Sequence, residues 1–359
     1  MVRRVCAALL ALLLTLCLPA AARAEDDAHK GTRHTVVDED ELAALVGQAA
    51  ADTHCAGAEI SVAVCFTRTG ETWSWNGDEW YYTASLYKLP MIMRFTRMAE
   101  EGGLDGLPAY YTEQTETIKE RVLVYSDNSW ASALWRQVFT EPDAVPQLSL
   151  DYAHFPADEL PADYFQTMHY SAPFMLGIVR ELYDHPDEYP GVLDYMRLAQ
   201  PEQYFRRELE GRYEIAQKYG SADGVNHAAG VIWTPSPILL VVMSDGLGPL
   251  LGDILIGRVA AAMADYALVV DERADEWERL EAEAAEQDAL AAEQAAAARA
   301  AETPAPEPQP EEAPAAEAAA LRATPPRWPL LLAVPLAAAG VWAYRRGKKD
   351  RRKERDEKS

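Results

Sequence analysis

A serine and a lysine stand three residues apart in the segment YYTASLYKLP, residues 81–90. On a helical turn, this spacing places Ser85 and Lys88 on one face, where an amine can take the proton of a hydroxyl. The spacing alone is weak evidence, because a chain of 359 residues is expected to contain roughly one such pair by chance. The segment is therefore either one turn of an ordinary amphipathic helix or a nucleophile with its base.

Lysine is scarce in the central part of the chain, which makes Lys88 more informative. Between Gly31 and Gly347 the only lysines are Lys88, Lys119 and Lys218, whereas arginines occur throughout. Arginine stays protonated, but a desolvated lysine can lose its proton and act as a base. Either compositional drift left these lysines at random, or those that lie in candidate motifs do chemistry that arginine cannot do.

Two further polar motifs follow in order along the chain. YSDN, residues 125–128, offers the hydroxyl of Ser126 and the amide of Asn128, while Asp127 is suited to cap a helix. KYG, residues 218–220, precedes a stretch of small residues. A lysine there can hold a carboxylate, and the strand can leave backbone N–H groups free for an extended substrate. Taken alone, each motif is more often a helix cap or a solvated strand start.

The ordered set S-x-x-K, S-D-N and K-x-G is similar to the motifs of class A β-lactamases and penicillin-binding proteins. Over residues 38–271 the chain resembles the class A β-lactamase family, in the branch that includes membrane-anchored serine hydrolases. That resemblance implies a serine hydrolase that forms an acyl-enzyme. The roles it implies are an acylated nucleophile (Ser85), its base (Lys88), a proton relay (Ser126), a ligand for the substrate amide (Asn128), a lysine that supports Ser126 and attracts the substrate carboxylate (Lys218), a substrate-binding strand (Tyr219, Gly220, Ser221), and an oxyanion hole formed by the N–H groups of Ser85 and Ser221.

The chain departs from the family in two places. The family usually has Thr or Ser in the middle of K-T-G, where this chain has Tyr219; Ser221 is a candidate to replace that hydroxyl. The family also deacylates with a glutamate in an E-x-x-L-N loop, and residues 148–169 contain Glu159 as their only glutamate. Glu159 is either the deacylation base or a solvated loop carboxylate. Without such a base the acyl-enzyme persists, as in a penicillin-binding protein or a slow hydrolase.

The pattern of elements predicts an α+β fold. Strands are expected near residues 58–80 and after residue 216, on either side of a helical middle, and a hairpin is expected within residues 230–244. We therefore expect an antiparallel sheet built from both chain ends, with flanking helices and a helical lobe between them, as in β-lactamases and transpeptidases. The domain is predicted to span residues 35–271 and to be followed by an Ala/Glu-rich helical stalk over residues 272–302.

Both ends of the chain carry targeting patterns. Residues 1–24 have the basic start, apolar core and small-residue cleavage site of a signal peptide. Residues 303–327 form a Pro/Ala/Glu-rich linker for which we expect disorder, and residues 328–344 are an apolar span edged by Trp and Tyr. The basic segment 345–359 predicts a cytoplasmic tail. The expected protein is exported and anchored in the cell membrane, with its catalytic domain outside.

Charge and cysteine content limit the remaining classes of function. The net charge of -24 argues against a nucleic-acid partner. Cys55 and Cys65 remain after signal cleavage, and the extended segment between them disfavours a disulfide. No cofactor and no metal are predicted. The expected function is the opening of β-lactam amide bonds, with roles in β-lactam catabolism and antibiotic resistance. The alternatives are a D,D-peptidase or transpeptidase acting on cell-wall peptides, and a catalytically idle module that binds them.

Overall fold

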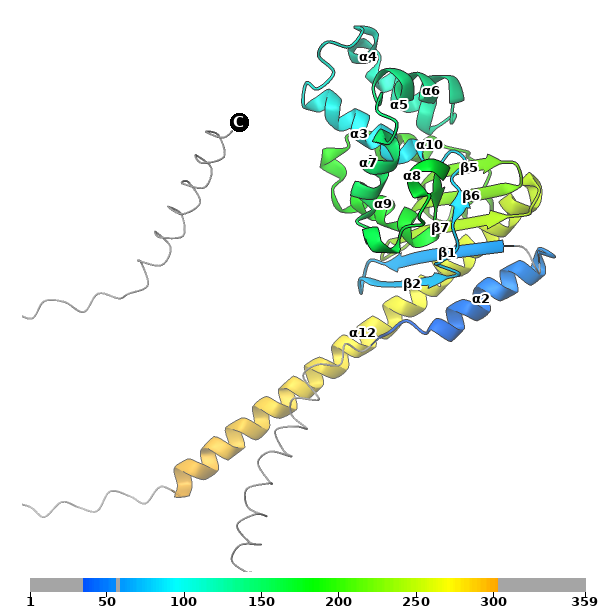
Figure 1. The fold of residues 1–359 in the computed structure, drawn as a ribbon. Helices are drawn as coiled ribbons and strands as arrows, with labels where there is room; N and C mark the ends of the chain where they lie inside the picture. Colours follow the sequence, from blue (N-terminus) through cyan, green and yellow to red (C-terminus); the bar gives the residue numbers. More distant parts are fainter. Residues whose placement is uncertain (1–34, 56–58, 303–359) are drawn as a thin grey trace, which may run out of the picture. The chain divides into compact units, whose positions relative to one another are not determined.

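The computed structural model describes residues 35–55 and 59–302 and has the predicted α+β fold. A five-stranded antiparallel sheet has the order β2-β1-β7-β6-β5, so strands from both parts of the chain lie side by side (Figure 1). A second, two-stranded sheet pairs β3 with β4. The strands are β1 (Glu59–Phe66), β2 (Glu71–Trp75), β3 (Tyr81–Tyr82), β4 (His169–Tyr170), β5 (Glu214–Ala222), β6 (Val225–Trp233) and β7 (Ile238–Asp245).

The central strands are apolar on both faces because both faces of the sheet are covered. From Ile238 to Ser244 every residue of β7 is buried, whereas the edge strand β2 buries only Trp73. The predicted hairpin corresponds to β6 and β7. The turn between β5 and β6 consists of Asp223 and Gly224, both with positive φ, as a two-residue turn of type I′ requires.

Two apolar cores lie on the two sides of the sheet. One contains Val46 of α2 and Val259 of α12 together with Val62 of β1. The other contains Ile92 of α3 and Phe174 of α9. The helices are α2 (Glu39–Asp52), α3 (Lys88–Glu100), α4 (Tyr110–Glu113), α5 (Thr115–Leu123), α6 (Asn128–Gln137), α7 (Ala144–Ala153), α8 (Tyr164–Thr167), α9 (Ala172–Asp184), α10 (Val192–Leu198), α11 (Arg206–Leu209) and α12 (Pro249–Glu302), with 3-10 turns η1 (Ala157–Glu159) and η2 (Pro186–Glu188).

The helical lobe comprises α3 to α10 and lies against the sheet face opposite α2 and α12 (Figure 1). Helix boundaries follow local capping chemistry. The Asp127 carboxylate accepts hydrogen bonds from the N–H groups of Ser129 and Trp130, which starts α6 as predicted. Ser171 caps α9 in the same way, through the N–H of Phe174.

The stalk segment predicted over residues 272–302 is helical as the second half of α12, and residues 281–295 are exposed along their whole length. Contacts divide the chain into Met1–Ala295 and Ala296–Ser359; the structure describes only residues 296–302 of the second unit, and these are helical. Across the described part of the chain, no helix combines the length and apolar character needed to cross a membrane. The predicted signal peptide 1–24, linker 303–327, span 328–344 and tail 345–359 lie outside the described residues.

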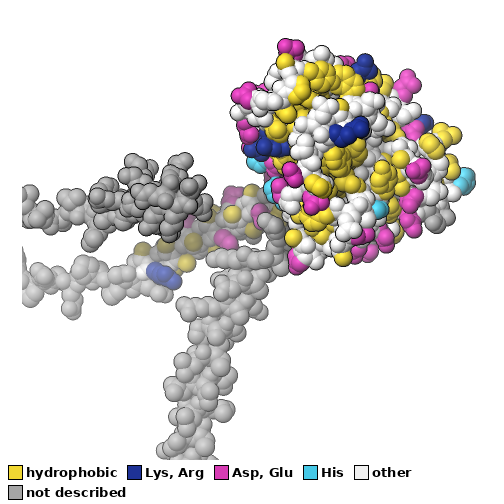
Figure 2. Space-filling view, turned by 45° about the horizontal axis from the view of Figure 1, so that its top comes forward, with side chains coloured by type: hydrophobic (Ala, Val, Ile, Leu, Met, Phe, Trp, Pro, Cys, Tyr) yellow, Lys and Arg dark blue, Asp and Glu magenta, His cyan; other side chains and the backbone are white. Residues whose placement is uncertain are grey.

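Both cysteines of the described residues lie in the interior, and the charged side chains on the surface shown in Figure 2 are mainly acidic. Cys55 and Cys65 are buried free thiols. On the face shown in Figure 2, Asp and Glu side chains are spread around the domain and only a few Lys and Arg side chains stand between them. This distribution on that face offers no basic stripe for a polyanion.

Candidate active site

Ser85 lies in a tight turn between β3 and α3. The N–H of Leu86 donates to the carbonyl of Thr83 (2.9 Å), and the N–H of Lys88 donates to the carbonyl of Ser85 (3.3 Å). The regular helix therefore begins at Lys88, and Ser85 lies in the turn that leads into it. Neither the Ser85 hydroxyl nor its N–H has a hydrogen-bond partner among the described residues. Both groups are thus free to meet a substrate.

Lys88 is fully buried at the start of α3, and its amine points at the YSDN segment. Its Nζ donates to the Ser126 carbonyl (2.6 Å), the Ser126 hydroxyl (3.3 Å) and the Asn128 side-chain oxygen (2.6 Å). Burial lowers the pKa of Lys88 to about 8, against the opposing effect of the Asp127 charge. The neutral, proton-accepting amine is therefore accessible near neutral pH, as a base requires.

Ser126 connects the two lysines. It has a positive φ of 52°, a conformation that costs a non-glycine residue about 1 kcal/mol. This conformation presents both its carbonyl and its hydroxyl to Lys88. The hydroxyl also accepts from the Nζ of Lys218 at 3.0 Å. A hydroxyl held between two amines is well placed to pass a proton between them and a substrate.

Lys218 is fully buried in β5 and faces the same hydroxyl as Lys88. Its pKa is lowered well below the usual value, first by burial and then by the nearby Lys88 charge. Among the described residues, Lys119 is the lysine that forms an ion pair, with Glu116, so neither active-site amine has a carboxylate partner. Two buried amines without a counter-charge form a site that favours an incoming anion.

Gly220 brings the KYG strand against the serine turn. A side-chain carbon at this position would lie 2.9 Å from the backbone nitrogen of Ser85 and 3.1 Å from the Thr83 carbonyl. Such contacts are too close for any residue with a Cβ atom, so this close approach of the two segments requires glycine. The sheet edge and the nucleophile turn are therefore held together by backbone packing.

Ser221 can complete an oxyanion hole through its backbone. β5 is an edge strand, and Ala222 pairs with Val225 across a two-residue turn, so Ser221 and Asn226 form the next, non-hydrogen-bonded pair. The N–H of Ser221 therefore points to the open edge. Its hydroxyl donates to the side chain of Asn226 at 3.0 Å. That bond turns the Ser221 hydroxyl away from the role of replacing a K-T-G threonine.

Tyr219 occupies the space beside Lys218. The Lys218 Nζ lies 4.2 Å from the centre of the Tyr219 ring and donates to the Tyr219 carbonyl at 2.7 Å. The Tyr219 ring stacks on Tyr204, with centroids 5.3 Å apart and planes at 25°. Tyr219 thus contributes an aromatic wall where the family motif has a small hydroxyl side chain.

Glu159 lies apart from this hydrogen-bonded cluster. It ends the 3-10 turn η1 and is exposed, and its carboxylate has no hydrogen bond or ion pair among the described residues. His227 is fully buried, and both ring nitrogens are engaged, with the Tyr82 carbonyl and the Ser244 N–H. Burial lowers the pKa of His227 to about 4, so it is a neutral packing residue. In the described chain, no carboxylate or free imidazole bonds to the serine cluster.

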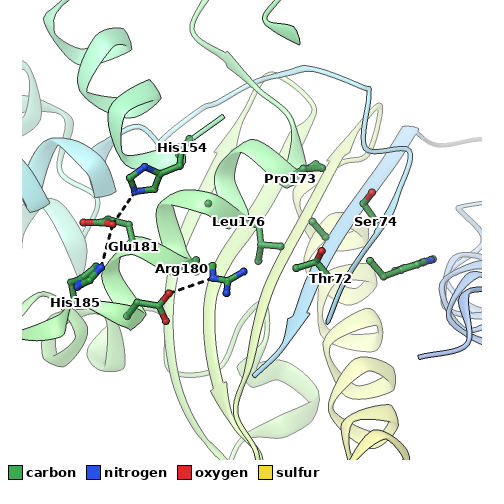
Figure 3. Close-up of a pocket in the computed structure, with 13 residues that line it drawn as sticks. Thr72, Ser74, His154, Pro173, Leu176, Arg180, Glu181 and His185 are labelled. Carbon is green, nitrogen blue, oxygen red and sulfur yellow. Dashed lines mark hydrogen bonds and ion pairs between the residues drawn. The ribbon is translucent and has the colours of Figure 1, made fainter. Parts of the chain in front are cut away.

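A pocket of about 510 Å³ lies elsewhere, between the edge strand β2 and α9 (Figure 3). None of the predicted site residues lines it. Its charged side chains are paired with one another: Arg180 with Asp184, and Glu181 with both His154 and His185. No metal-binding group of three or more His, Cys, Asp or Glu side chains occurs within residues 35–55 and 59–302.

Sequence reasoning identified the residues that meet at Ser126 but missed their supports. Asn226 holds the Ser221 hydroxyl, Tyr204 stacks on Tyr219, and the fully buried Gln217 stands directly before Lys218. The available signal for Gln217 was an uncharged polar residue that directly precedes the lysine of a candidate strand motif.

The model of the "Beta-lactamase enzyme family" matches residues 39–119 and 114–267. A β-lactamase from Sphaerobacter thermophilus is 21% identical with a TM-score of 0.52, covering 64% of this chain and 98% of that chain. One from Xanthomonas campestris is 18% identical with a TM-score of 0.53, covering 64% and 99%. A class A β-lactamase described as the last common ancestor of Gram-negative bacteria is 21% identical with a TM-score of 0.52, covering 62% and 99%. No curated protein matches the chain.

Proposed function

The chain belongs to the beta-lactamase enzyme family, and we propose that it is a serine hydrolase that opens β-lactam amides through an acyl-enzyme on Ser85. The observation that carries this proposal is the convergence of two buried amines on one hydroxyl: Lys88 and Lys218 both bond to Ser126. Such an arrangement costs stability, because it buries two amines without a carboxylate. It is expected where proton transfer is the purpose.

In the proposed acylation, the Ser85 oxygen attacks the amide carbonyl and its proton passes to neutral Lys88. The C–N bond then breaks, and the leaving nitrogen takes a proton from Ser126, which is reprotonated by Lys88. The free N–H of Ser85 and the edge-facing N–H of Ser221 stabilise the carbonyl oxygen as it becomes negative. The amine of Lys218 and the open edge of β5 receive the substrate carboxylate.

Asn128 has a second task in this proposal. Its side-chain oxygen accepts from Lys88 at 2.6 Å, so it orients the base in addition to binding the substrate amide through its NH₂ group. Deacylation is the slow step of the proposal, because the Glu159 carboxylate forms no hydrogen bond with the serine cluster. The access of water to Ser126 or Lys88, which would then have to activate it for deacylation, would limit turnover.

A second candidate function rests on the same absence. Since no carboxylate in the described chain bonds to the cluster, a long-lived acyl-enzyme suits a D,D-peptidase or transpeptidase acting on cell-wall peptides. The test is to incubate the full-length chain with a chromogenic cephalosporin and a fluorescent penicillin, beside Ser85→Ala. Steady colour formation supports the lactamase, and a stable label on Ser85 without turnover supports the peptidase. The absence of both turnover and labelling would contradict both enzymatic functions and favour an idle binding module.

We propose further that this domain works outside the cell on a membrane tether. The support is in the sequence: a signal-peptide pattern in residues 1–24 and an apolar segment with a basic tail in residues 328–359. Cell fractionation with protease shaving of intact cells tests this placement. Loss of the domain upon shaving is expected, and its protection in intact cells would contradict the proposal.

A further inference from the structure

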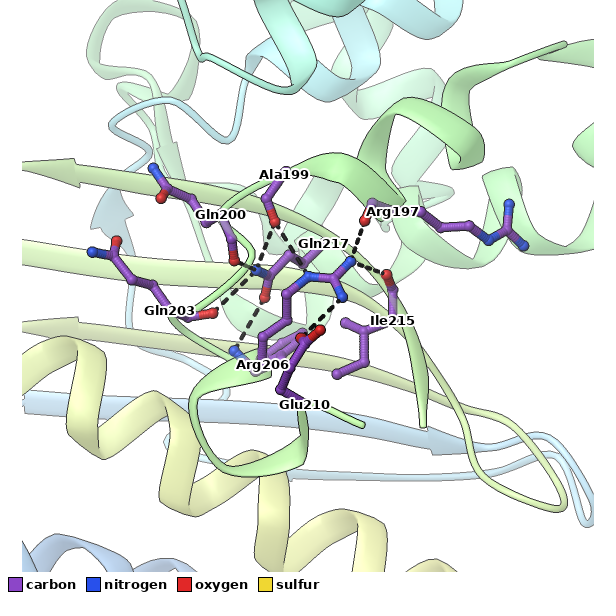
Figure 4. Close-up of polar contacts among 9 residues, drawn as sticks. Arg197, Ala199, Gln200, Gln203, Arg206, Glu210, Ile215 and Gln217 are labelled. Atoms are coloured by element: carbon purple, nitrogen blue, oxygen red, sulfur yellow. Dashed lines mark hydrogen bonds and ion pairs between the residues drawn. The ribbon is translucent and has the colours of Figure 1, made fainter. Parts of the chain in front are cut away.

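Gln217 is a fully buried amide one residue before Lys218, and its side chain binds the backbone of the segment Ala199–Phe205 (Figure 4). Its NH₂ group lies within hydrogen-bond distance of the carbonyls of Ala199 (3.1 Å), Gln200 (3.2 Å) and Gln203 (3.1 Å). Its carbonyl oxygen accepts from the N–H of Phe205 at 3.1 Å. One side chain on β5 therefore bonds to three carbonyls and one N–H of the segment. The bonds to Ala199 and Phe205 are buried, and those to Gln200 and Gln203 are partly buried.

The segment needs such support because its backbone is strained. Gln200 and Tyr204 have positive φ values of 45° and 58°, which non-glycine residues adopt at a cost of about 1 kcal/mol each. The N–H of Tyr204 also donates to the Asp253 carboxylate of α12 at 2.5 Å. Arg206, which directly follows the segment, donates to the carbonyl of Ala199 at the start of the segment and to the carbonyl of Ile215 on β5. The conformation is thus fixed from β5, from α12 and from within.

What this segment presents to the active site is Tyr204. Its ring is nearly fully buried and stacks on Tyr219, whose own ring lies 4.2 Å from the Lys218 amine. Tyr219 is only partly buried and forms no hydrogen bond through its hydroxyl among the described residues. Its position therefore depends on ring packing, and the Tyr204 ring is the partner that the strained segment supplies.

We propose that Gln217 is a positioning residue for substrate binding: it holds the segment Ala199–Phe205 so that Tyr204 fixes the Tyr219 ring beside Lys218. The inference rests on the proposed function, because it concerns the wall against which the carboxylate end of the acyl donor would lie. Gln217, Tyr204 and Tyr219 contact neither Ser85 nor Lys88 through any hydrogen bond of the described residues. Their loss should weaken the pre-acylation complex far more than the acylation step.

The decisive variant is Gln217→Glu in the full-length chain. It keeps the size of the side chain but turns a carboxylate toward three carbonyls and removes the donors. With fluorescent penicillin in stopped flow, the apparent dissociation constant of the pre-acylation complex should rise about tenfold, since displaced substrate contacts cost affinity. The limiting acylation rate should change by less than about threefold. Gln48→Glu, which alters an exposed amide that bonds to Asp52 on α2, is the matched control.

Tyr204 variants test the same path without touching Gln217. Tyr204→Leu should reproduce the loss of affinity, and Tyr204→Phe, which keeps the ring, should restore it to within about twofold. These two variants decide the question if thermal melting shows that Gln217→Glu does not fold. Hydrogen exchange at the N–H of Phe205 should speed up in folded Gln217→Met, because methionine lacks the oxygen that accepts from this N–H. A merely distant effect would not produce this change.

The outcomes separate this inference from the proposed function. If the wild-type chain is not acylated, the proposed function fails, and exchange at Phe205 still decides whether Gln217 holds the segment. If the wild type is acylated and the affinity is unchanged in both Gln217→Glu and Tyr204→Leu, the inference is overturned alone. An equal fall in the acylation rate with unchanged affinity would also overturn it, since Gln217 would then act on the chemistry.

Discussion

The five-stranded sheet has two edge strands, β5 and β2, and the two edges differ in whether their charged side chains have partners of opposite charge. At the β5 edge, Lys88 and Lys218 are fully buried and share the Ser126 hydroxyl without a carboxylate partner. At the β2 edge, a pocket of about 510 Å³ holds several charged groups, but each is paired, as Glu181 is with His154. The β5 edge is thus electrostatically incomplete, whereas the β2 edge is complete.

This difference indicates that buried amines without a carboxylate partner identify the candidate active site better than the volume of a pocket does. Arg180 and Asp184 already form an ion pair, so a charged ligand would have to displace one partner in order to bind the other. At the β5 edge, strained backbone at Ala84 and Ser126 and a glycine contact at Gly220 hold the reacting groups in place. At the β5 edge, the two unpaired buried amines lower stability but leave the reacting groups preorganised.

The largest expected effect comes from removing the nucleophile. Ser85→Ala should abolish covalent labelling by fluorescent penicillin, because no other described hydroxyl combines an unbonded position with the two-lysine cluster. Mass spectrometry of the labelled protein measures the adduct directly. A label that persists in this variant would show that the β5 edge has been assigned the wrong nucleophile. Substituting Ser74→Ala, at the β2 pocket, is the control and should leave the label intact.

The next largest effect should come from Lys88→Arg. Arginine keeps the positive charge but does not release its proton, so acylation should fall by about 10³-fold or more. The measurement is the rate of labelling at pH 7.5 over several hours. Lys119→Arg is the matched control, since Lys119 forms an ordinary ion pair with Glu116. Retained acylation in Lys88→Arg would contradict the assignment of the base.

Gly220→Ala tests whether backbone contact aligns the two halves of the site. The added carbon would lie 2.9 Å from the Ser85 nitrogen, so the serine turn or β5 must move. We expect acylation to slow by about 10²-fold, which is typical when reacting groups shift by an ångström. Gly47→Ala is the control, because its added carbon on α2 meets no atom within 4 Å. Similar acylation rates in both variants would show that the contact is not needed.

The pH dependence of acylation should report the buried base. Because burial lowers the pKa of Lys88 to about 8, the neutral amine is the minor form at pH 6 and the major form above pH 8. Acylation should therefore rise about tenfold from pH 6 to pH 7 and level off above about pH 8. Stopped-flow labelling between pH 6 and pH 9 measures the profile. A rate that falls over this range would mean that the protonated amine is the active form.

Much of this site was predictable from local sequence rules. The three-residue spacing of Ser85 and Lys88, the cap at Asp127 and the strand character of KYG depend on neighbours in the chain, and each was found where predicted. The antiparallel sheet with strands from both ends of the domain followed from the order of elements and is confirmed. These features are set by periodicity and capping, which a sequence displays directly.

The rest depended on contacts between distant segments. The Lys88 amine turns toward Ser126 and Asn128, which are about forty positions along the chain, and no local rule gives that direction. The role of Gln217 becomes visible only in the fold, where its side chain bonds to the segment Ala199–Phe205. Likewise, no local rule gives the exposure of Glu159, which lies in a 3-10 turn without a buried residue.

The smallest expected effect is at the β2 edge, where Glu181→Gln should leave acylation unchanged. The Glu181 carboxylate accepts from the Tyr189 hydroxyl at 2.7 Å and lies 3.0 Å from the His154 ring, and these hydrogen bonds lower its pKa against the effect of burial.

A carboxylate whose folded pKa is depressed stabilises the fold above its unfolded pKa, and that contribution is lost as the pH falls through the folded value. The free energy of unfolding should thus drop by about 1 kcal/mol in Glu181→Gln at pH 7, and the difference should shrink as the pH falls through the lowered pKa of the folded state. Urea titrations at pH 7 and pH 3 measure this, while labelling by fluorescent penicillin at pH 7 tests independence from the site. A labelling rate that changed more than about threefold in folded Glu181→Gln would break the comparison, because the two edges would then be coupled through α9, which packs on the central strands between them.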